Sequence, residues 1–489
     1  MAAPEGPLVV GVDSSTQSTK ALVVDAATGQ VVARGQALHR VSEGPGRESD
    51  PEQWWGALCE ALAQCGPVAR EAVAVSVAGQ QHGLVTLDSA GRPVRPALLW
   101  NDVRSAPQRD RLVEELGGPK VWAERIGSVP APAFTITKWA WLRENEPEVA
   151  AAVAAVRLPH DYLTERLTGR GTSDRGDSSG TGWWSAATRA YDEELLEHVG
   201  LSPALLPEVL APAEPAGTVR EELTGLPLAP GALVAPGTGD NMAAALGLGL
   251  RPGQPVISLG TSGTVYAVTR RRPADPTGTV AGFADARGDW LPLACTLNCT
   301  LAVDRIAALL GRDREAVEAG GEAVCLPFLD GERTPNLPYA SGLLHGLRHD
   351  TTAGQVLQAA YDGAVFALLA ALDRVLDGET TYGGGGEDET ADEQAPVLLI
   401  GGGARGTAWR ETVRRLSGRP VQVPRAAELV ALGAAAQAAG VLTGEDPAAV
   451  ARRWGTDRGP AHGPVARDDA AWERVSTTLA AAGGLLGDA

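Results

Sequence analysis

The sequence predicts an α/β protein built from two related halves. Two apolar, β-rich runs flank a turn of small hydroxyl residues, and this hairpin pattern is written twice, about 250 residues apart, over 9–25 and 256–268. A strand–strand–strand–helix–strand order accompanies both copies. The length of 489 residues also exceeds what one ordinary core holds. We therefore expect two α/β domains with the same order of elements.

The first half begins with three expected strands and a helix. The helix opens at Asp50-Pro51-Glu52, an N-cap residue followed by proline at the first helical position. The expected elements are strands at 8–13, 20–25 and 30–37, a helix at 51–65 and a strand at 72–77.

The second half repeats this order after a mixed, mostly helical middle region at 104–230. Its expected elements are strands at 255–259, 264–269 and 290–294, helices at 300–311 and 353–376, a strand at 397–400 and a helix at 407–417. We place the two domains at 1–245 and 246–489. The Gly-rich, acidic segment 378–394 is expected to be a disordered surface insertion because it has little apolar surface to bury.

Composition excludes two classes of function. The formal net charge of −18 disfavours a nucleic-acid partner, because phosphate backbones are held by basic patches. No run of 18 apolar residues occurs, so we expect no membrane span and no membrane partner. The N-terminus has neither a basic segment nor an apolar core, so we expect a cytoplasmic protein without a signal peptide.

The five cysteines show no disulfide spacing. Cys295 and Cys299 could form half of a metal site, but no nearby Cys or His pair completes it. Free thiols in a reducing compartment are the expectation.

Both hairpin turns are candidate phosphate sites. A turn of Ser, Thr, Gly and Gln presents backbone N–H groups and hydroxyls to one point, which suits a phosphate. Two such turns suggest two halves that grip one nucleotide between them. Asp13 ends the first strand, where it could hold hydrated Mg²⁺ beside phosphates. The alternative is an aspartate that merely starts a turn.

A second carboxylate, Asp240, lies in the run Pro236-Gly237-Thr238-Gly239-Asp240-Asn241, after an expected strand and before a small-residue helix. Flanking glycines allow a ligand to come close to the backbone, and a carboxylate there could orient or deprotonate a hydroxyl. The alternative is that Asp240 is only the N-cap of the following helix.

Two polar clusters follow apolar strands and could hold a sugar. Gln81-His82 and Trp100-Asn101-Asp102 combine hydrogen-bonding groups with an aromatic face, as sugar hydroxyls and C–H surfaces require. A lone histidine such as His82 is more often structural. Gly401-Gly402-Gly403, between a strand and a helix, is a nucleotide-type loop, although a tight packing turn has the same composition.

Taken together, these motifs resemble the FGGY family of carbohydrate kinases, in the actin/hexokinase-like superfamily. Within that family the chain is most similar to the branch that phosphorylates D-xylulose. The resemblance runs from Val9 to about residue 440. Its most specific segments are Asp50–Trp55, Ala78–Gly83, Leu99–Asp102, Leu158–Leu163, Ser258–Gly263, Gly331–Pro335 and Ile400–Arg405.

The resemblance implies a fold and a set of roles. The fold is two ribonuclease H-like domains, each a mixed β-sheet flanked by helices, with ATP and sugar in the cleft between them. Asp240 corresponds to the catalytic base, and Asp13, with Asp240, to the metal position. The sugar side comprises Gln81, His82, Trp100, Asn101, Asp102, Asp240 and Asn241, and the ATP side comprises Thr16, Lys20, Gly260, Thr261, Ser262, Gly402, Gly403, Ala404 and Arg405.

The implied reaction is transfer of the γ-phosphoryl group of ATP, with Mg²⁺, to the terminal hydroxyl of D-xylulose. Alternatives are another sugar or polyol (L-ribulose, gluconate, glycerol or a deoxyketose) and a sensor that binds without turnover. The family is often dimeric, so a homodimer is one expected assembly. Ser15 replaces the family's usual glycine, Gln81 stands where methionine is frequent, and the acidic pair Asp174 and Asp177 has no assigned role.

Overall fold

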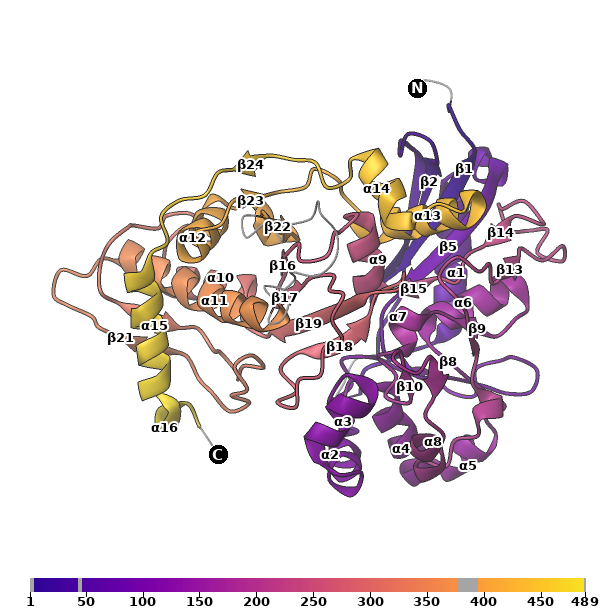
Figure 1. Ribbon diagram of the computed structural model, residues 1–489, viewed down its shortest axis with the longest axis horizontal. Helices are drawn as coiled ribbons and strands as arrows, with labels where there is room; N and C mark the ends of the chain where they lie inside the picture. The colour runs from indigo at the N-terminus through magenta and orange to yellow at the C-terminus, as the bar shows by residue number, and fades with distance from the viewer. Residues whose placement is uncertain (1–3, 43–45, 377–394, 488–489) are drawn as a thin grey trace.

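The chain folds into two lobes, each centred on a seven-stranded sheet with helices packed against it (Figure 1). The computed structural model describes residues 4–42, 46–376 and 395–487. The predicted insertion at 378–394 lies outside the described residues. In both sheets the first strand pairs antiparallel with the second and parallel with a later strand, so the predicted duplication is confirmed.

The first sheet carries the first predicted phosphate turn between its two opening strands. Strand β1 is buried along its whole length, which explains its continuous apolar run. It lies between antiparallel β2 and parallel β5. The strand order is β13 (Gly217–Thr218), β14 (Leu233–Val234), β5 (Ala72–Gly79), β1 (Leu8–Ser14), β2 (Ser18–Asp25) and β3 (Val31–Leu38), with β15 (Thr238–Gly239) also paired to β5.

The second sheet carries the second turn in the equivalent place. Its strand order is β18 (Ala281–Ala284), β19 (Trp290–Thr296), β17 (Gly263–Tyr266), β16 (Val256–Leu259), β22 (Val397–Ile400), β23 (Val421–Gln422) and β24 (Ala461–His462). One of its faces packs on helices α10 (Thr300–Leu309), α11 (Ala353–Leu376) and α12 (Thr407–Ser417). Helix α11 is long and apolar enough to cross a membrane, but 83% of its apolar window is buried, as in the core helix of a soluble protein.

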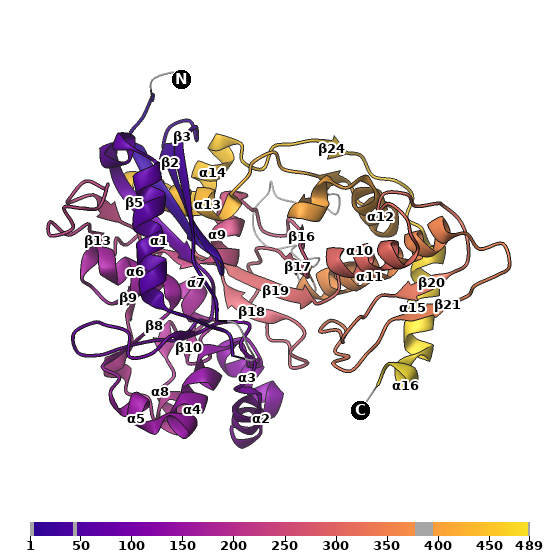
Figure 2. The ribbon, with the colours of Figure 1, turned by 180° about the vertical axis from the view of Figure 1, so that it is seen from behind.

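Helices from both ends of the chain cover the first sheet. Helix α1 (Pro51–Gln64) packs on β2 and β3, and the Asp50 side chain accepts a hydrogen bond from Glu52 N, as predicted for its N-cap. On the other face lies α13 (Leu429–Thr443), a helix from the second half of the sequence that packs against β1, β5 and α9 (Asp240–Gly247) (Figures 1 and 2). The first lobe is therefore completed by a helix that lies, in sequence, between strands β23 and β24 of the second sheet.

The remaining elements form an accessory region of the first lobe, a small two-stranded sheet (β20 and β21) that packs on α11, and the chain's C-terminal end. The middle region is mostly helical, as expected, with short two-stranded sheets. The helices are α2 (Ala106–Glu115), α3 (Gly118–Ile126), α4 (Thr135–Asn145), α5 (Pro147–Ala151), α6 (Pro159–Thr168), α7 (Arg175–Ser178), α8 (Glu193–His198), α14 (Pro447–Trp454), α15 (Asp469–Ala481) and α16 (Gly483–Leu486). The minor strands are β4 (Glu48–Ser49), β6 (Val85–Leu87), β7 (Ala97–Leu98), β8 (Ala155–Arg157), β9 (Thr172–Ser173), β10 (Trp184–Ser185), β11 (Ala190–Tyr191), β12 (Glu208–Val209), β20 (Val324–Leu326) and β21 (Leu343–His345).

The cysteines agree with the expectation of free thiols. All five are unpaired. In the ranges that the structure covers, no group of three or more His, Cys, Asp or Glu side chains is arranged to hold a metal ion, which argues against a Cys295–Cys299 site.

Candidate functional site

The first phosphate turn joins β1 to β2 and carries a buried carboxylate at its base. Asp13 is 4% exposed, and Ser15 Oγ donates a hydrogen bond to Asp13 Oδ1 at 2.6 Å. Ser15 N donates to Ser18 O at 3.0 Å, which closes the turn. The non-glycine residues with positive φ in the described chain are His82, Arg189, Asp330 and Glu428. Ser15 is not among them, so it occupies this position without the freedom of glycine.

The second phosphate turn joins β16 to β17 and is open to solvent. Thr261 and Ser262 are exposed, and Gly260 N donates to Ser262 O at 3.2 Å. Thr300, at the start of α10, holds Gly260 O through its backbone N–H and its hydroxyl, at 3.1 and 2.8 Å. Thr300 thus fixes the backbone of the turn, while the exposed Thr261 and Ser262 hydroxyls could bind a ligand.

The predicted adenosine loop lies beside this second turn. Gly402–Arg405 form a short 3₁₀ helix directly after β22, in contact with β16. A side chain at Gly403 would meet Leu259 and Thr300, whereas a Cβ at Gly402 would meet no atom within 4 Å. Gly402 therefore faces open space next to the phosphate turn, and Arg405 is exposed beside it.

Asp240 is the first residue of α9, directly after β15. The N-cap is Gly239, so the alternative interpretation of Asp240 as the N-cap is wrong. Its Oδ1 accepts hydrogen bonds from Asn241 N at 2.8 Å and Asn241 Nδ2 at 3.1 Å. These two bonds hold the carboxylate in one orientation.

The pKa of Asp240 is raised to about 7, first by burial and then by the charges of Asp13 and Asp177. The pKa of Asp13 is also raised by burial, although the Ser15 hydroxyl and Lys20 oppose the rise. A carboxylate with a pKa near neutral is well matched to accept a proton at neutral pH. The Asp13 charge thus acts on Asp240, although Lys20 and the Ser15 hydroxyl stabilise the charged form of Asp13.

The same two carboxylates fit a Mg²⁺ ion held together with phosphates. Magnesium usually takes only one or two protein carboxylates, and its other ligands are waters and substrate phosphates. Asp13 stands beside the phosphate turn, and its charge raises the pKa of Asp240. A divalent cation there would remove the repulsion that raises the pKa of Asp240.

The predicted sugar side is assembled around Asp240. Asn241 Nδ2 donates to Gln81 Oε1 at 2.8 Å, so these two predicted residues are brought together. His82 has φ 65°, its ring stacks on Phe134 at 4.9 Å, and its Nδ1 lies 2.8 Å from Gly180 O. Burial, with help from the Lys138 charge, lowers the pKa of His82 to about 3. The neutral ring donates from Nδ1, which leaves Nε2 as a hydrogen-bond acceptor for a ligand.

The Trp100-Asn101-Asp102 cluster divides into ligand-facing and structural parts. Trp100 is 40% exposed, and its Nε1 donates to Thr16 Oγ1 at 3.1 Å, so it joins the sugar-side loop to the first phosphate turn. Asp102 is 1% exposed, forms an ion pair with Arg104 and accepts a hydrogen bond from Arg47 N. Its carboxylate is thus already engaged within the loop.

Lys20 is also engaged. Its Nζ lies 2.5 Å from Glu428 Oε2, in the residue before α13. Lys20 is close enough to lower the pKa of Asp13, so it stands beside the phosphate turn with a carboxylate partner already in place.

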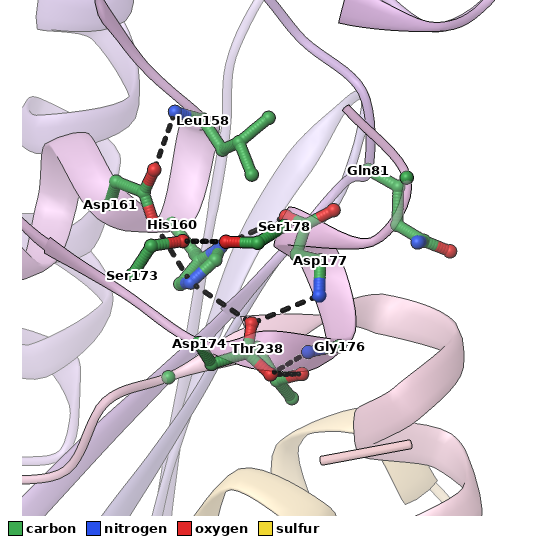
Figure 3. A network of polar contacts seen from close by, with 12 residues as sticks. Gln81, Leu158, His160, Asp161, Ser173, Asp174, Gly176, Asp177, Ser178 and Thr238 are labelled. Carbon is green, nitrogen blue, oxygen red and sulfur yellow. Dashed lines mark hydrogen bonds and ion pairs between the residues drawn. The ribbon is translucent and has the colours of Figure 1, made fainter. Parts of the chain in front are cut away.

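A buried polar cluster behind this site was not predicted. It consists of His160, Asp161, Asp174 and Asp177, which we call the His160 cluster, and Figure 3 shows it with its neighbours. The motifs around it were visible in the sequence, but nothing there indicated that α6 and α7 meet. A surface cavity of about 330 Å³, lined by residues between Gln108 and Val199, lies apart from all predicted site residues.

Comparison with known proteins gives a consistent result. The model of the FGGY family of carbohydrate kinases, N-terminal domain, matches residues 8–247, and that of the C-terminal domain matches residues 256–441. Xylulose kinases from Streptomyces rubiginosus and Streptomyces coelicolor are each 74% identical, over 99% of this chain and 98% of theirs. The crystal structure of xylulose kinase from Bifidobacterium adolescentis is 37% identical, with a TM-score of 0.85, and covers 97% of this chain and 99% of that one. Gluconate kinase from Lactobacillus acidophilus, with a TM-score of 0.86 at 18% identity over 98% of each chain, shares the fold.

Proposed function

The chain belongs to the FGGY family of carbohydrate kinases, and from that premise we propose that it transfers the γ-phosphoryl group of ATP to the terminal hydroxyl of D-xylulose. The observation that carries the choice of sugar is 74% identity to two xylulose kinases over nearly the full length of both. The contacts of Asp240 support the same reaction, because Asn241 links it to the sugar-binding candidate Gln81 and the charge of Asp13, at the first phosphate turn, acts on it.

We assign the proton transfer to Asp240. Its raised pKa, about 7, makes it a competent acceptor for the proton of the attacking hydroxyl near neutral pH. Asn241 holds the carboxylate through two hydrogen bonds, so the acceptor oxygen is oriented before the substrate arrives. Phosphoryl transfer has a loose transition state, and positioning of this kind supplies much of the catalysis.

The two hydroxyl-rich turns are assigned to the phosphates. The Thr261 and Ser262 hydroxyls are exposed on a turn that Thr300 holds in place, which suits the γ-phosphate. Thr16 lies on the opposite turn and is linked to Trp100. Gly402 and its neighbours would take the adenosine, because their backbone faces open space. Mg²⁺, which Asp13 with Asp240 would hold, supplies charge neutralisation between the phosphates when bound.

On the sugar side, the ketose would lie against Gln81, His82 and Asn241. The neutral His82 ring offers Nε2 to a sugar hydroxyl, and Trp100 offers an exposed apolar face. Exclusion of water by the bound ligands would protect ATP from hydrolysis. We place the enzyme in the cytoplasm, which cell fractionation would test, and we propose a homodimer as one candidate assembly, which sedimentation would test.

The test of this function is ADP release by the purified protein with Mg-ATP and a panel of acceptors. We expect strong stimulation by D-xylulose and weak stimulation by L-ribulose, gluconate and glycerol. Stronger stimulation by one of the others would move the specificity and keep the kinase. Absence of turnover with every acceptor would favour the sensor alternative.

A further inference from the structure

The His160 cluster is a charge cluster closed off from solvent. His160, Asp161 and Asp177 are 0% exposed and Asp174 is 3% exposed. His160 Nδ1 lies 2.9 Å from Asp177 Oδ2, while Nε2 lies 3.1 Å from Asp161 Oδ1 and 3.6 Å from Asp174 Oδ1. Burial lowers the pKa of His160, but the three carboxylates outweigh it and raise the pKa to about 9, so the ring is cationic at neutral pH.

A contribution to folding stability does not by itself explain this cluster. Removing several charges from water is expensive, and a buried ion pair is often no more stabilising than apolar side chains of the same volume. Desolvation raises the pKa of all three aspartates, which shows that burial disfavours their charged forms here. A role for the cluster is therefore to be sought in what it touches.

One carboxylate of the cluster reaches the sugar side. Asp177 lies between His160 and Gln81, as Figure 3 shows, and the Gln81 amide is near enough to lower the pKa of Asp177. In the described chain, Gln81 Nε2 and Asp177 Oδ1 are both buried, and neither has a hydrogen-bond partner. Gln81 Oε1 accepts from Asn241 Nδ2, which also donates to Asp240 Oδ1. A line of polar side chains thus runs from His160 through Asp177, Gln81 and Asn241 to the proposed base, with a direct hydrogen bond at every step except that between Asp177 and Gln81.

The direction of the two amides in this line depends on the charge at its inner end. An ionised carboxylate only accepts hydrogen bonds, whereas a carboxamide donates at one end and accepts at the other. Ionised Asp177 therefore requires the NH₂ end of Gln81, which turns its oxygen toward Asn241. Asn241 must then present its NH₂ group to Gln81 and Asp240, and its own oxygen to the ligand. A neutral group at 177 would allow both amides to turn over.

We propose that the His160 cluster is a positioning device for the sugar site: the His160 ring holds the Asp177 carboxylate in place at 2.9 Å, and Asp177 sets the direction of the Gln81 and Asn241 amides beside Asp240. Asp177 and His160 are positioning residues, since they act through Gln81. The proposal rests on the proposed function for the identity of the acceptor. It gives the unassigned acidic residue of the 173–177 segment a task in substrate recognition.

The experiment is a double-mutant cycle between positions 177 and 81, followed by steady-state kinetics. In Asp177→Asn, the new amide accepts from His160 and turns its NH₂ group toward Gln81, which opposes the native direction. We expect kcat/KM for D-xylulose to fall about ten-fold, the effect of one charge-assisted hydrogen bond, with KM for Mg-ATP within about two-fold of wild type. In a Gln81→Met background, which has no amide to turn, the same change at 177 should lower kcat/KM less than about two-fold.

The matched control is Asp362→Asn in α11, which removes another buried carboxylate that is bonded to Gln358 and Arg415, away from the site. It should lower stability and leave the kinetics unchanged. A loss of equal size on Asp177→Asn in both backgrounds, or no loss in the wild-type background, overturns the proposal and makes the cluster structural. Should Asp177→Asn not fold, Gln81→Glu tests the same contact. We expect kcat/KM for D-xylulose of Gln81→Glu to be at least ten-fold lower than that of Gln81→Met, because two carboxylates would face each other. Equal activity of those two variants overturns the proposal.

Failure of the proposed function is read separately, from the wild-type protein. If D-xylulose does not stimulate wild-type turnover, the acceptor assignment fails, and the cycle is run with whichever acceptor the wild type phosphorylates. The non-additivity at positions 177 and 81 is expected with any acceptor that contacts Asn241.

Discussion

At the residue scale, we propose that Asp240 carries the chemistry. It lies in the first turn of α9, Asn241 fixes its orientation, and burial and neighbouring carboxylates raise its pKa to about 7. A group placed in this way accepts a proton when phosphoryl transfer makes the sugar hydroxyl acidic. Asn241 connects this carboxylate to Gln81 of the proposed sugar side, and the charge of Asp13, at the first phosphate turn, raises its pKa.

Replacement of Asp240 by asparagine should remove the proton acceptor and keep its shape. We expect kcat to fall about 10³-fold or more, because the base and part of the positioning are lost together. Asp469→Asn is the control, since Asp469 also lies in the first turn of a helix, α15, and is not one of the proposed site residues. Steady-state ADP release and thermal melts measure both variants; near-normal turnover of Asp240→Asn would refute the assignment.

His160 gives a pH dependence of stability. Its pKa is about 9 in the folded protein against 6.5 for an ordinary histidine. The protonated ring therefore contributes stability in full below about pH 6.5, and the contribution is lost as the pH rises through about 9. Urea unfolding from about pH 6 to 10 should show a steeper alkaline loss for wild type than for His160→Gln. Parallel profiles would mean that His160 is neutral in the fold.

The sequence indicated the individual residues of the site better than their partners. Asp13, Asp240, Asn241 and Gln81 could be singled out because each follows a strand in a small-residue context, and the structure brings them together. The partner of Lys20 could not be found in this way, since Glu428 lies 408 residues away along the chain. The sequence indicated no role for Asp177, because its neighbour in the fold, Gln81, belongs to a distant part of the sequence.

At the scale of elements, α13 joins the two halves of the chain. The sequence patterns predicted the main strands of both sheets and the helices at 51–65, 353–376 and 407–417, because those segments alternate or carry clear caps. They did not predict α13, whose residues are small and apolar on all sides. Its place against β1 and α9 follows from close backbone approach: a Cβ at Gly433 would lie 1.8 Å from Ala243 O, and one at Gly11 would lie 1.9 Å from Ala431 O.

Substitution of Gly433 by alanine tests this contact. The added methyl group meets backbone and not a movable side chain, so α13 must shift, and we expect a loss of about 1–3 kcal/mol in the free energy of unfolding. Gly56→Ala in α1 is the matched control, because nothing lies within 4 Å of a Cβ there. That variant should gain about 0.5–1 kcal/mol from helix propensity. Denaturant unfolding of both variants measures the difference; a neutral Gly433→Ala would show that α13 is loosely packed.

At the scale of the molecule, we propose that one nucleotide contacts both lobes. The turn between β1 and β2 belongs to the first sheet, and the turn between β16 and β17 to the second. The division of the chain at 245/246 stays a prediction, since α13 crosses back to the first sheet.

Hydrogen exchange tests the shared grip on the nucleotide. A non-hydrolysable ATP analogue with Mg²⁺ should slow amide exchange at both turns together, because backbone N–H groups of both would bond to its phosphates. The turn at Asp88–Arg92, closed by its own hydrogen bonds, should be unaffected and serves as the internal control. Protection of one turn alone would mean that the nucleotide is held by one lobe.

The proposed reaction, with Asp240 as its base, is tested most directly by phosphorylation of D-xylulose with the purified protein, followed by ADP release and by ³¹P NMR of the product. We expect D-xylulose to stimulate ADP release far more than L-ribulose, gluconate or glycerol, and we expect the phosphate on the terminal hydroxyl of the product. Asp240→Asn should abolish both the ADP release and the product signal. Undiminished phosphorylation by Asp240→Asn, or a wild-type protein that ignores D-xylulose, would contradict this proposal.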